Sequence, residues 1–288
     1  MRDLNYEINK LCERNKDGSK STQANRKEIL NQIANQIHAL GFRNLKLGNI
    51  KPKHIEALVN HWLLEGLAPG TLKNRMSCLR WVAEKLNKPS LIAKDNSHYG
   101  IDRRTYVTNI SKACDLDLEK LEKITDSYVK LSLKLQELFG LRREESIKFI
   151  AEWSDRGDHI VLKASWCKGG RSREIPIRNE QQRNLLNEVK SFSKGKSLIP
   201  INLSYVQQMN RYKDQTAKAC LCKMHGLRHA FAQLRYLELT GRLAPAAGGK
   251  TSKELTAEEK VLDKQARLII SRELGHEREQ ITAVYLGR

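Results

Sequence analysis

The stretch "KMHGLRHAFAQL", residues 223–234, places two imidazoles and a guanidinium around one glycine. On a helix, His225 shares a face with Arg228 at i, i+3 and with His229 at i, i+4. Arginine offers paired hydrogen bonds to phosphate oxygens, and histidine can transfer a proton near neutral pH. The stretch is therefore compatible with a metal site, a phosphate site or an ordinary helix start, and the rest of the chain decides among them.

A metal site is the weakest of these three interpretations. A zinc-protease helix needs H-E-x-x-H, in which the Glu activates the metal-bound water, whereas positions 226 and 228 here are Gly and Arg. A cation beside two ligands opposes a divalent metal. The six cysteines are scattered without a C-x-x-C pair, so we expect reduced thiols. We predict no metal and no cofactor.

The net charge of +19 is shared by both halves of the chain. The excess is +9 over residues 1–110 and +10 over residues 111–288, so it is not confined to a basic tail. This distribution favours two basic domains on one polyanion, because each phosphate contact releases condensed counterions. The sequence contains neither a long apolar run typical of a membrane span nor a signal peptide. We expect a cytoplasmic, nucleoid-associated protein whose partner is double-stranded DNA.

Helical periodicity dominates the first third of the chain. It predicts three helices, over residues 25–41, 53–66 and 71–87, the last of them capped by Thr71. The buried stripe of the third helix is predicted to hold Leu72, Met76, Leu79 and Val82. Periodicity is lost over about 88–110, which we assign to a linker. We therefore predict a helical N-terminal domain over residues 1–105.

The remaining residues, 106–288, are predicted to form a second, mostly helical domain. Helical patterning resumes over 116–140 and 142–153, and residues 159–178 alternate like two strands around a glycine pair. Residues 241–256 read as a loop, and Thr256 with Glu259 forms a capping box that begins a new helix. The predicted fold class is mainly α, with two domains and one small antiparallel sheet.

Three further stretches carry residue types that suit phosphate chemistry. Arg142 comes two residues after Gly140 and precedes Glu145 by three positions, and Lys168 stands at the tip of the predicted hairpin. His276 follows Gly275, and Tyr285 comes nine residues after that histidine. Each motif alone is unremarkable, but together with residues 225–229 they form an ordered set.

This ordered set resembles the tyrosine recombinase family, the phage-integrase type of site-specific recombinases. The family order is G-L-R-x-x-E, a hairpin lysine, H-x-L-R-H, L-G-H and a tyrosine near the C-terminus. The chain carries each in turn: Gly140-Leu141-Arg142 with Glu145, then Lys168, His225 to His229, Leu274-Gly275-His276, and Tyr285. The motifs cover residues 140–286. Residues 1–105 resemble the family's SAM-like core-binding domain only in helical content, charge and the stretch "APGTLKNRMSCLRW", residues 68–81.

The resemblance implies a site-specific recombinase or integrase that cuts and rejoins DNA through a 3′-phosphotyrosine, for integration or excision of a mobile genetic element. It implies that Tyr285 is the nucleophile and that Arg142 and Arg228 hold the scissile phosphate. By the same resemblance, the remaining catalytic roles fall to His276 as a donor to a non-bridging oxygen, His225 as the group that manages the proton of the nucleophile, and Lys168 as the general acid. No metal is required, because cationic side chains can stabilise the charge of the transition state.

Several nearby residues compete for these roles. Arg143 adjoins Arg142, but the glycine-leucine spacing favours Arg142. The rivals to Lys168 are Lys163, Arg171 and Arg173. The remaining candidates are expected to have other roles: Glu145 steadies Arg142 or is a solvated carboxylate, His229 is structural, and Tyr236 lacks the L-G-H lead-in.

Two features depart from the family pattern. His276 lies 48 residues after Arg228, and the extra segment, about residues 241–265, is a candidate protein-contact element. Only three residues follow Tyr285, although the resemblance implies a homo-tetramer on two DNA sites, with accessory DNA-bending proteins as candidate partners. No separate arm-binding domain precedes the helices, so we expect an enzyme that reads only the core site. The alternatives are a type IB topoisomerase-like relaxing enzyme and a non-catalytic DNA-binding accessory protein.

Overall fold

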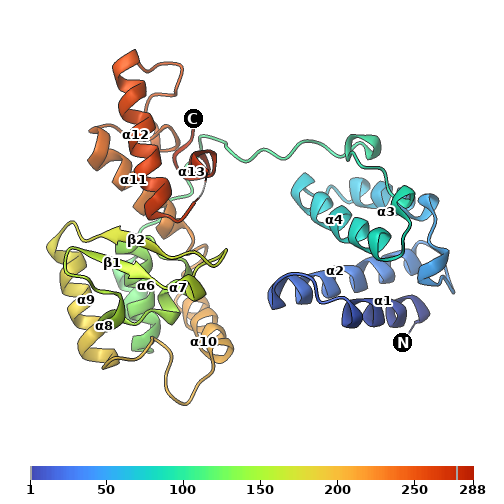
Figure 1. The fold of residues 1–288 in the computed structure, drawn as a ribbon, viewed down its shortest axis with the longest axis horizontal. Coiled ribbons are helices and arrows are strands. Elements are labelled where there is room, and N and C mark those ends of the chain that lie inside the picture. The colour runs from blue at the N-terminus through green and yellow to red at the C-terminus, as the bar shows by residue number, and fades with distance from the viewer. Residues whose placement is uncertain (1, 277) are drawn as a thin grey trace. The chain divides into compact units, whose positions relative to one another are not determined.

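The computed structural model describes residues 2–276 and 278–288, which divide into two compact units, Met1–Thr105 and Tyr106–Arg288 (Figure 1). Helices dominate both units, and the second also holds a two-stranded antiparallel sheet. The predicted fold class, mainly α with two domains and one small sheet, is confirmed. Over the described residues, no helix is both long and apolar enough to cross a membrane.

The first unit is a bundle of α-helices around an apolar core. Its α-helices are α1 (Asp3–Arg14), α2 (Lys20–Ala39), α3 (Pro52–Leu64) and α4 (Pro69–Lys85). The predicted stripe on α4 is buried as expected at Leu72, Met76, Leu79 and Val82. Trp62 of α3 is fully buried, and its indole N–H donates to Gln36 Oε1 at 2.9 Å.

The start of α4 differs from the prediction. The helix begins at Pro69 with Ala68 as its N-cap, two residues before the Thr71 that we expected to cap it. Proline is favoured in the first helical turn, because its fixed φ suits the helix and the N–H that it lacks would have had no helical partner. Pro69 therefore lies inside the helix and not in a turn before it.

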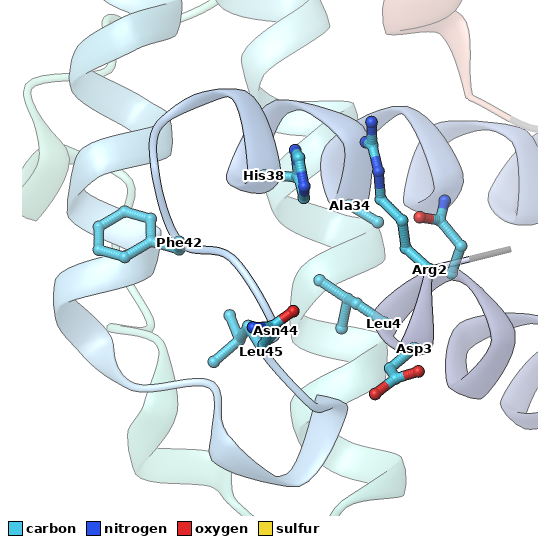
Figure 2. A pocket seen from close by; sticks show the side chains of 9 residues that line it. Arg2, Asp3, Leu4, Ala34, His38, Phe42, Asn44 and Leu45 are labelled. Atoms are coloured by element: carbon cyan, nitrogen blue, oxygen red, sulfur yellow. The ribbon is translucent and has the colours of Figure 1, made fainter.

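A small pocket of the first unit lies beside α1 and the end of α2. Its lining mixes charged, polar and apolar side chains: Arg2, Asp3, Leu4, Asn5, Ala34, His38, Phe42, Asn44 and Leu45 (Figure 2). It contains none of the residues that the sequence singles out for chemistry.

The second unit begins with two helices where one was predicted. Residues 116–140 form α5 (Leu118–Glu122) and α6 (Ser127–Phe139), with Asp126 between them. The Asp126 carboxylate accepts from the backbone N–H of Val129 at 3.1 Å and so caps a new helix. The later helices are α7 (Arg143–Lys148), α8 (Ala151–Ser154), α9 (Glu180–Ser193), α10 (Tyr205–Lys218), α11 (Gly226–Thr240), α12 (Ala257–Glu273) and α13 (Glu279–Leu286).

The sheet pairs β1 (His159–Leu162) with β2 (Arg173–Pro176), Leu162 lying opposite Arg173. The connection is longer than a tight hairpin turn, because residues 163–172 include a short 3₁₀ helix, Ala164–Trp166. Trp166 packs edge-on against Trp153, with ring centroids 5.7 Å apart. The connection is thus anchored by one aromatic side chain, and Lys168 follows in its exposed part.

One apolar cluster joins α6, α11, α12 and α13. In Figure 1, α11, α12 and α13 lie close together, and α6 packs against α11. The cluster includes Phe139, Phe231, Ile270 and Leu286, all buried. Gly140 ends α6 with φ of +59°, and a Cβ there would lie 2.5 Å from the ring of Phe231. The glycine therefore permits close packing of the end of α6 against α11. The predicted capping box of α12, Thr256 with Glu259, is also confirmed.

Candidate active site

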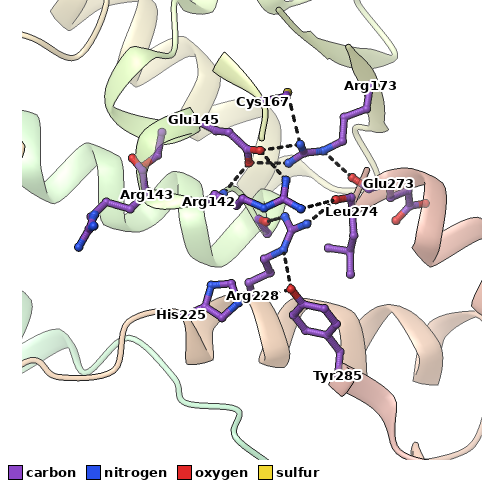
Figure 3. Close-up of polar contacts among 12 residues, drawn as sticks. Arg142, Arg143, Glu145, Cys167, Arg173, His225, Arg228, Glu273, Leu274 and Tyr285 are labelled. Atoms are coloured by element: carbon purple, nitrogen blue, oxygen red, sulfur yellow. Dashed lines mark hydrogen bonds and ion pairs between the residues drawn. The ribbon is translucent and has the colours of Figure 1, made fainter. Parts of the chain in front are cut away.

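Arg228, in the first turn of α11, lies at the centre of the motif residues (Figure 3). Its side chain is 1% exposed. Nη1 donates to the carbonyl of Gly140, Nη2 donates to the carbonyl of Leu274, and Nε lies 3.4 Å from the Tyr285 hydroxyl. Burial, and then the nearby Arg173 and Arg142, lower the pKa of Arg228 to about 10, which leaves it charged at neutral pH.

Arg142 is held beside Arg228 by a capping box at the start of α7. Its backbone N–H donates to Glu145 Oε2 at 2.6 Å, and its Nη1 donates to Oε1 at 2.7 Å. Its Nη2 reaches the Leu274 carbonyl at 3.4 Å, the same carbonyl that Arg228 uses. The Arg142 side chain keeps 20% of its surface exposed, so an anion could reach it from solvent.

Arg173, which the sequence offers only as a rival to Lys168, is part of the arginine cluster in the structure. It is 7% exposed, and two of its nitrogens donate to the carboxylate of Glu145 at 2.6 and 2.7 Å. Its Nε donates to the backbone carbonyl of Glu273 at 2.9 Å. Strand alternation could have found it, since Arg173 shares the buried face of β2 with Ile175.

Glu145 is the buried counter-charge of this arginine cluster. Burial by itself would raise its pKa, but hydrogen bonds from Arg173 and the charges of Arg173, Arg228 and Arg142 lower the pKa to about 2. The carboxylate is therefore ionised at neutral pH. Because one carboxylate faces three guanidinium groups, the cluster keeps an excess of positive charge and favours an anion.

Tyr285 of α13 lies against this cluster and is 6% exposed. Its hydroxyl is 3.4 Å from His225 Nε2, and its ring lies 4.5 Å from that of His229. The ring of His276 stacks on Tyr285 with centroids 5.4 Å apart. His276 Nδ1 is buried and has no hydrogen-bond partner among residues 2–276 and 278–288.

The three histidines around Tyr285 are neutral at physiological pH. Burial lowers the pKa of His225, with further contributions from Arg228 and Arg142. Burial likewise lowers the pKa of His229 to about 4 and that of His276 to about 3. A neutral imidazole can accept a proton, and His225 Nε2 is the ring nitrogen within reach of the phenol.

The structure thus brings together five of the six predicted site residues: Arg142, His225, Arg228, His276 and Tyr285. Lys168 lies in the exposed connection between β1 and β2 and makes no hydrogen bond to these five within the described part of the chain. Its rival Lys163 lies 4.5 Å from the ring centroid of Trp153.

Two other competitors lie outside the cluster. Arg143 points away from it in Figure 3, with its guanidinium 6.0 Å from the ring of Tyr212. Tyr236 is buried on α11, where its hydroxyl donates to Asp263 at 2.6 Å. Over the described residues, no group of three His, Cys, Asp or Glu side chains is placed to hold a metal ion.

Glu145→Gln tests the charge balance of the cluster. Because folding lowers the pKa of Glu145 from 4.5 to about 2, the stability that it contributes is present above pH 4.5 and is lost as pH falls toward 2. Across that window the wild type should lose about 3 kcal/mol of unfolding free energy through this group, and Glu145→Gln should lose less. Urea titrations at several acidic pH values measure both slopes. Equal slopes would contradict the assignment, and Glu174→Gln, exposed on β2, is the matched control.

Two family models match most of the chain. The model for the N-terminal domain of phage integrases matches residues 1–91, and the integrase model matches residues 102–234. No curated protein matches the chain by sequence.

Solved structures of DNA-bound recombinases share the fold. A lambda integrase dimer bound to a COC′ core site has a TM-score of 0.62 and 17% identity, covering 99% of this chain and 77% of that chain. XerH recombinase bound to a palindromic difH substrate has a TM-score of 0.59 and 18% identity, covering 99% and 81%. A Tn1549 transposon integrase in complex with circular intermediate DNA has a TM-score of 0.57 and 14% identity, covering 100% and 96%.

The family models show which family the chain belongs to, and the solved structures show the same fold over almost the whole chain. The chain therefore belongs to the phage integrase family of tyrosine recombinases and is an enzyme of that class.

Proposed function

We propose that the chain is a site-specific recombinase that cuts and rejoins DNA through a covalent 3′-phosphotyrosine at Tyr285. The observation that carries the proposal is the position of the Tyr285 hydroxyl, 3.4 Å from both Arg228 Nε and His225 Nε2. A buried phenol facing a buried guanidinium and a neutral imidazole is placed for nucleophilic attack on an anionic ester.

In the proposed first step, the Tyr285 oxygen attacks phosphorus and the bond from phosphorus to the 5′-oxygen breaks. The proton of the phenol must be accepted as the new bond forms. The neutral His225 is the acceptor within reach. The step exchanges one phosphate ester for another, so the 5′-hydroxyl of a second strand can reverse it without an external energy source.

The proposed transition state gathers negative charge on the non-bridging oxygens of the phosphate. Arg142 and Arg228 are the donors assigned to them, because a guanidinium has more N–H groups than the carbonyls of Gly140 and Leu274 can use. His276 is assigned a third contact, since its ring lies against Tyr285. Preorganised donors of this kind stabilise developing charge without reorganising during the reaction.

The leaving 5′-oxygen needs a proton, and Lys168 is assigned to supply it. The lysine lies in the ten-residue connection between β1 and β2, whose later end leads directly into Arg173. An exposed lysine on a connection of this length can move onto a substrate while Arg173 keeps the strand fixed to Glu145. General acids of this type accelerate reactions by roughly 10²- to 10⁴-fold.

We assign the first unit, residues 1–105, to binding of the core DNA site, and residues 106–288 to catalysis. The net charge of +9 over residues 1–110 supports a DNA-binding role for the first unit. We propose that the chain acts in the DNA-containing compartment as a homo-tetramer on two sites. Among its structural relatives, lambda integrase has been solved as a tetramer bound to a Holliday junction, and the Tn1549 integrase comes from a transposon. A role in moving a genetic element is consistent with both, and accessory DNA-bending proteins remain candidate partners.

Tyr285→Phe tests the nucleophile directly. Nicked duplexes selected for binding from a random-sequence pool are incubated with protein, and covalent adducts are separated on a denaturing gel. Wild type should form the adduct and Tyr285→Phe should not, while DNA affinity stays within about twofold because phosphate contacts supply it. Tyr205→Phe, at the start of α10, is the matched control and should behave as wild type. An adduct with Tyr285→Phe would refute the assignment. A wild type that binds without any adduct would favour the non-catalytic accessory protein.

Lys168→Ala tests the general acid through the leaving group. On ordinary DNA the variant should cleave roughly 10²-fold slower or worse, because the 5′-alkoxide leaves without a proton. On DNA with sulfur replacing the bridging 5′-oxygen, the variant should approach the wild-type rate, since a thiolate leaves readily unprotonated. Single-turnover cleavage measures both rates, and Lys163→Ala is the control. If Lys163→Ala is the variant rescued by sulfur, the assignment of Lys168 is wrong.

A further inference from the structure

The residues just after Tyr285 are held by a buried chain of polar side chains from α11 and α12. Arg267 Nη1 donates to the carbonyl of Gly287 at 2.9 Å, and its Nε donates to both carboxylate oxygens of Asp263, at 2.8 and 2.9 Å. Asp263 also accepts from the Tyr236 hydroxyl at 2.6 Å. Tyr236 and Arg267 are 1% and 5% exposed, so this row of hydrogen-bonded side chains is shielded from water.

The same segment is fixed at two further points. Gln233 Nε2 donates to the carbonyl of Tyr285 itself at 3.0 Å. The Asn109 amide donates to the carbonyl of Arg288 and accepts from its N–H, both at 2.8 Å. Gly287 has φ of +78°, and a Cβ there would lie 2.7 Å from the backbone nitrogen of Ala246. The backbone around the phenol is therefore clamped on several sides.

These contacts depend on the extra segment, residues 241–265, which makes the spacing between Arg228 and His276 longer than is usual in the family. Asp263 lies within residues 241–265, and Arg267 follows one turn later on α12. The segment could simply have formed a surface element. Instead it supplies Asp263, which pairs with Arg267 just beyond the segment. Arg267 Nη1 in turn donates to the Gly287 carbonyl, two residues beyond Tyr285.

We propose that Arg267, oriented by Asp263 and Tyr236, is a positioning residue that sets the Tyr285 hydroxyl against Arg228 and His225 within the same chain. This inference rests on the proposed function, because it concerns the reach of the nucleophile. Arg267 touches neither the phosphate nor the phenol. It acts through the Gly287 carbonyl, and an error of about 1 Å in the placement of a reacting group can cost roughly 10²-fold in rate.

A second element of the proposal concerns charge. The positive Arg267 and negative Asp263 neutralise each other in a buried site, and removal of one partner leaves the other uncompensated. Loss of Arg267 could therefore destabilise the fold as well as misplace Tyr285. Asn109→Gly removes a second contact to the residues after Tyr285 without disturbing the fold, because Asn109 is exposed and glycine adopts its backbone φ of +50° without strain.

The test compares cleavage rate with DNA affinity in Arg267→Met, Arg267→Lys and Asn109→Gly. Each full-length variant is saturated with the selected nicked duplex, and single-turnover adduct formation and the equilibrium Kd are measured. Arg267→Met should slow adduct formation by about tenfold or more with Kd within about twofold, and Asn109→Gly should slow it several-fold. Arg267→Lys should recover part of the rate, because an ammonium can still donate to the Gly287 carbonyl.

The matched control is Arg242→Met, which removes an arginine of residues 241–265 that pairs with Glu259. It should cleave as wild type. Wild-type rates for both Arg267→Met and Asn109→Gly at saturation would overturn the inference. A second result would also overturn it: Arg267→Met loses rate and affinity equally while Asn109→Gly keeps the wild-type rate. Arg267 would then contribute to stability alone. An adduct formed by Tyr285→Phe would instead overturn the proposed function, so the two failures are distinguishable.

Discussion

A buried arginine is the constraint on which the active site depends. Arg228 is almost fully removed from water, and an ionised group in that position is tolerated only with good hydrogen-bond partners. Its partners are the carbonyls of Gly140 and Leu274, which lie just after the last residues of α6 and α12. Helix C-termini carry partial negative charge. Two helix ends therefore converge on one guanidinium, and this convergence brings residues far apart in sequence to the phenol of Tyr285.

Glu145, the anionic partner of the arginine cluster, also anchors the strand that follows Lys168. Glu145 binds Arg142 on one side and Arg173 on the other, so the arginine nearest to solvent and the first residue of β2 share one carboxylate. The connection that carries Lys168 ends at this strand. Movement of that connection is thus limited on its C-terminal side by a buried ion pair, and on its N-terminal side by the packing of Trp166 against Trp153. These anchors fix the connection on both sides of Lys168, which itself lies in the exposed part.

Sequence patterns predict the features that local periodicity and the order of residue types determine. The buried stripe of α4 and the capping box of α12 belong to this class, whereas the gathering of five motif residues around one point was implied by the resemblance to the family. The patterns missed what depends on tertiary partners. Arg173 is one of several basic residues in the sequence, and its contact with Glu145 appears only in the fold. No sequence pattern singles out Arg267, whose bond to the Gly287 carbonyl also appears only in the fold. Periodicity also does not report where a helix begins. The fixed φ of Pro69 sets the start of α4, and the side-chain cap of Asp126 sets the start of α6.

The central claim is that the arginine cluster binds the scissile phosphate in line with Tyr285. A crystal structure of the protein with nicked duplex and orthovanadate tests it most directly, because vanadate adopts the five-coordinate geometry of phosphoryl transfer. The account predicts vanadium bonded to the Tyr285 oxygen, with equatorial oxygens accepting from Arg142, Arg228 and His276. Vanadium bound away from Tyr285, or equatorial oxygens that contact neither arginine, would contradict it.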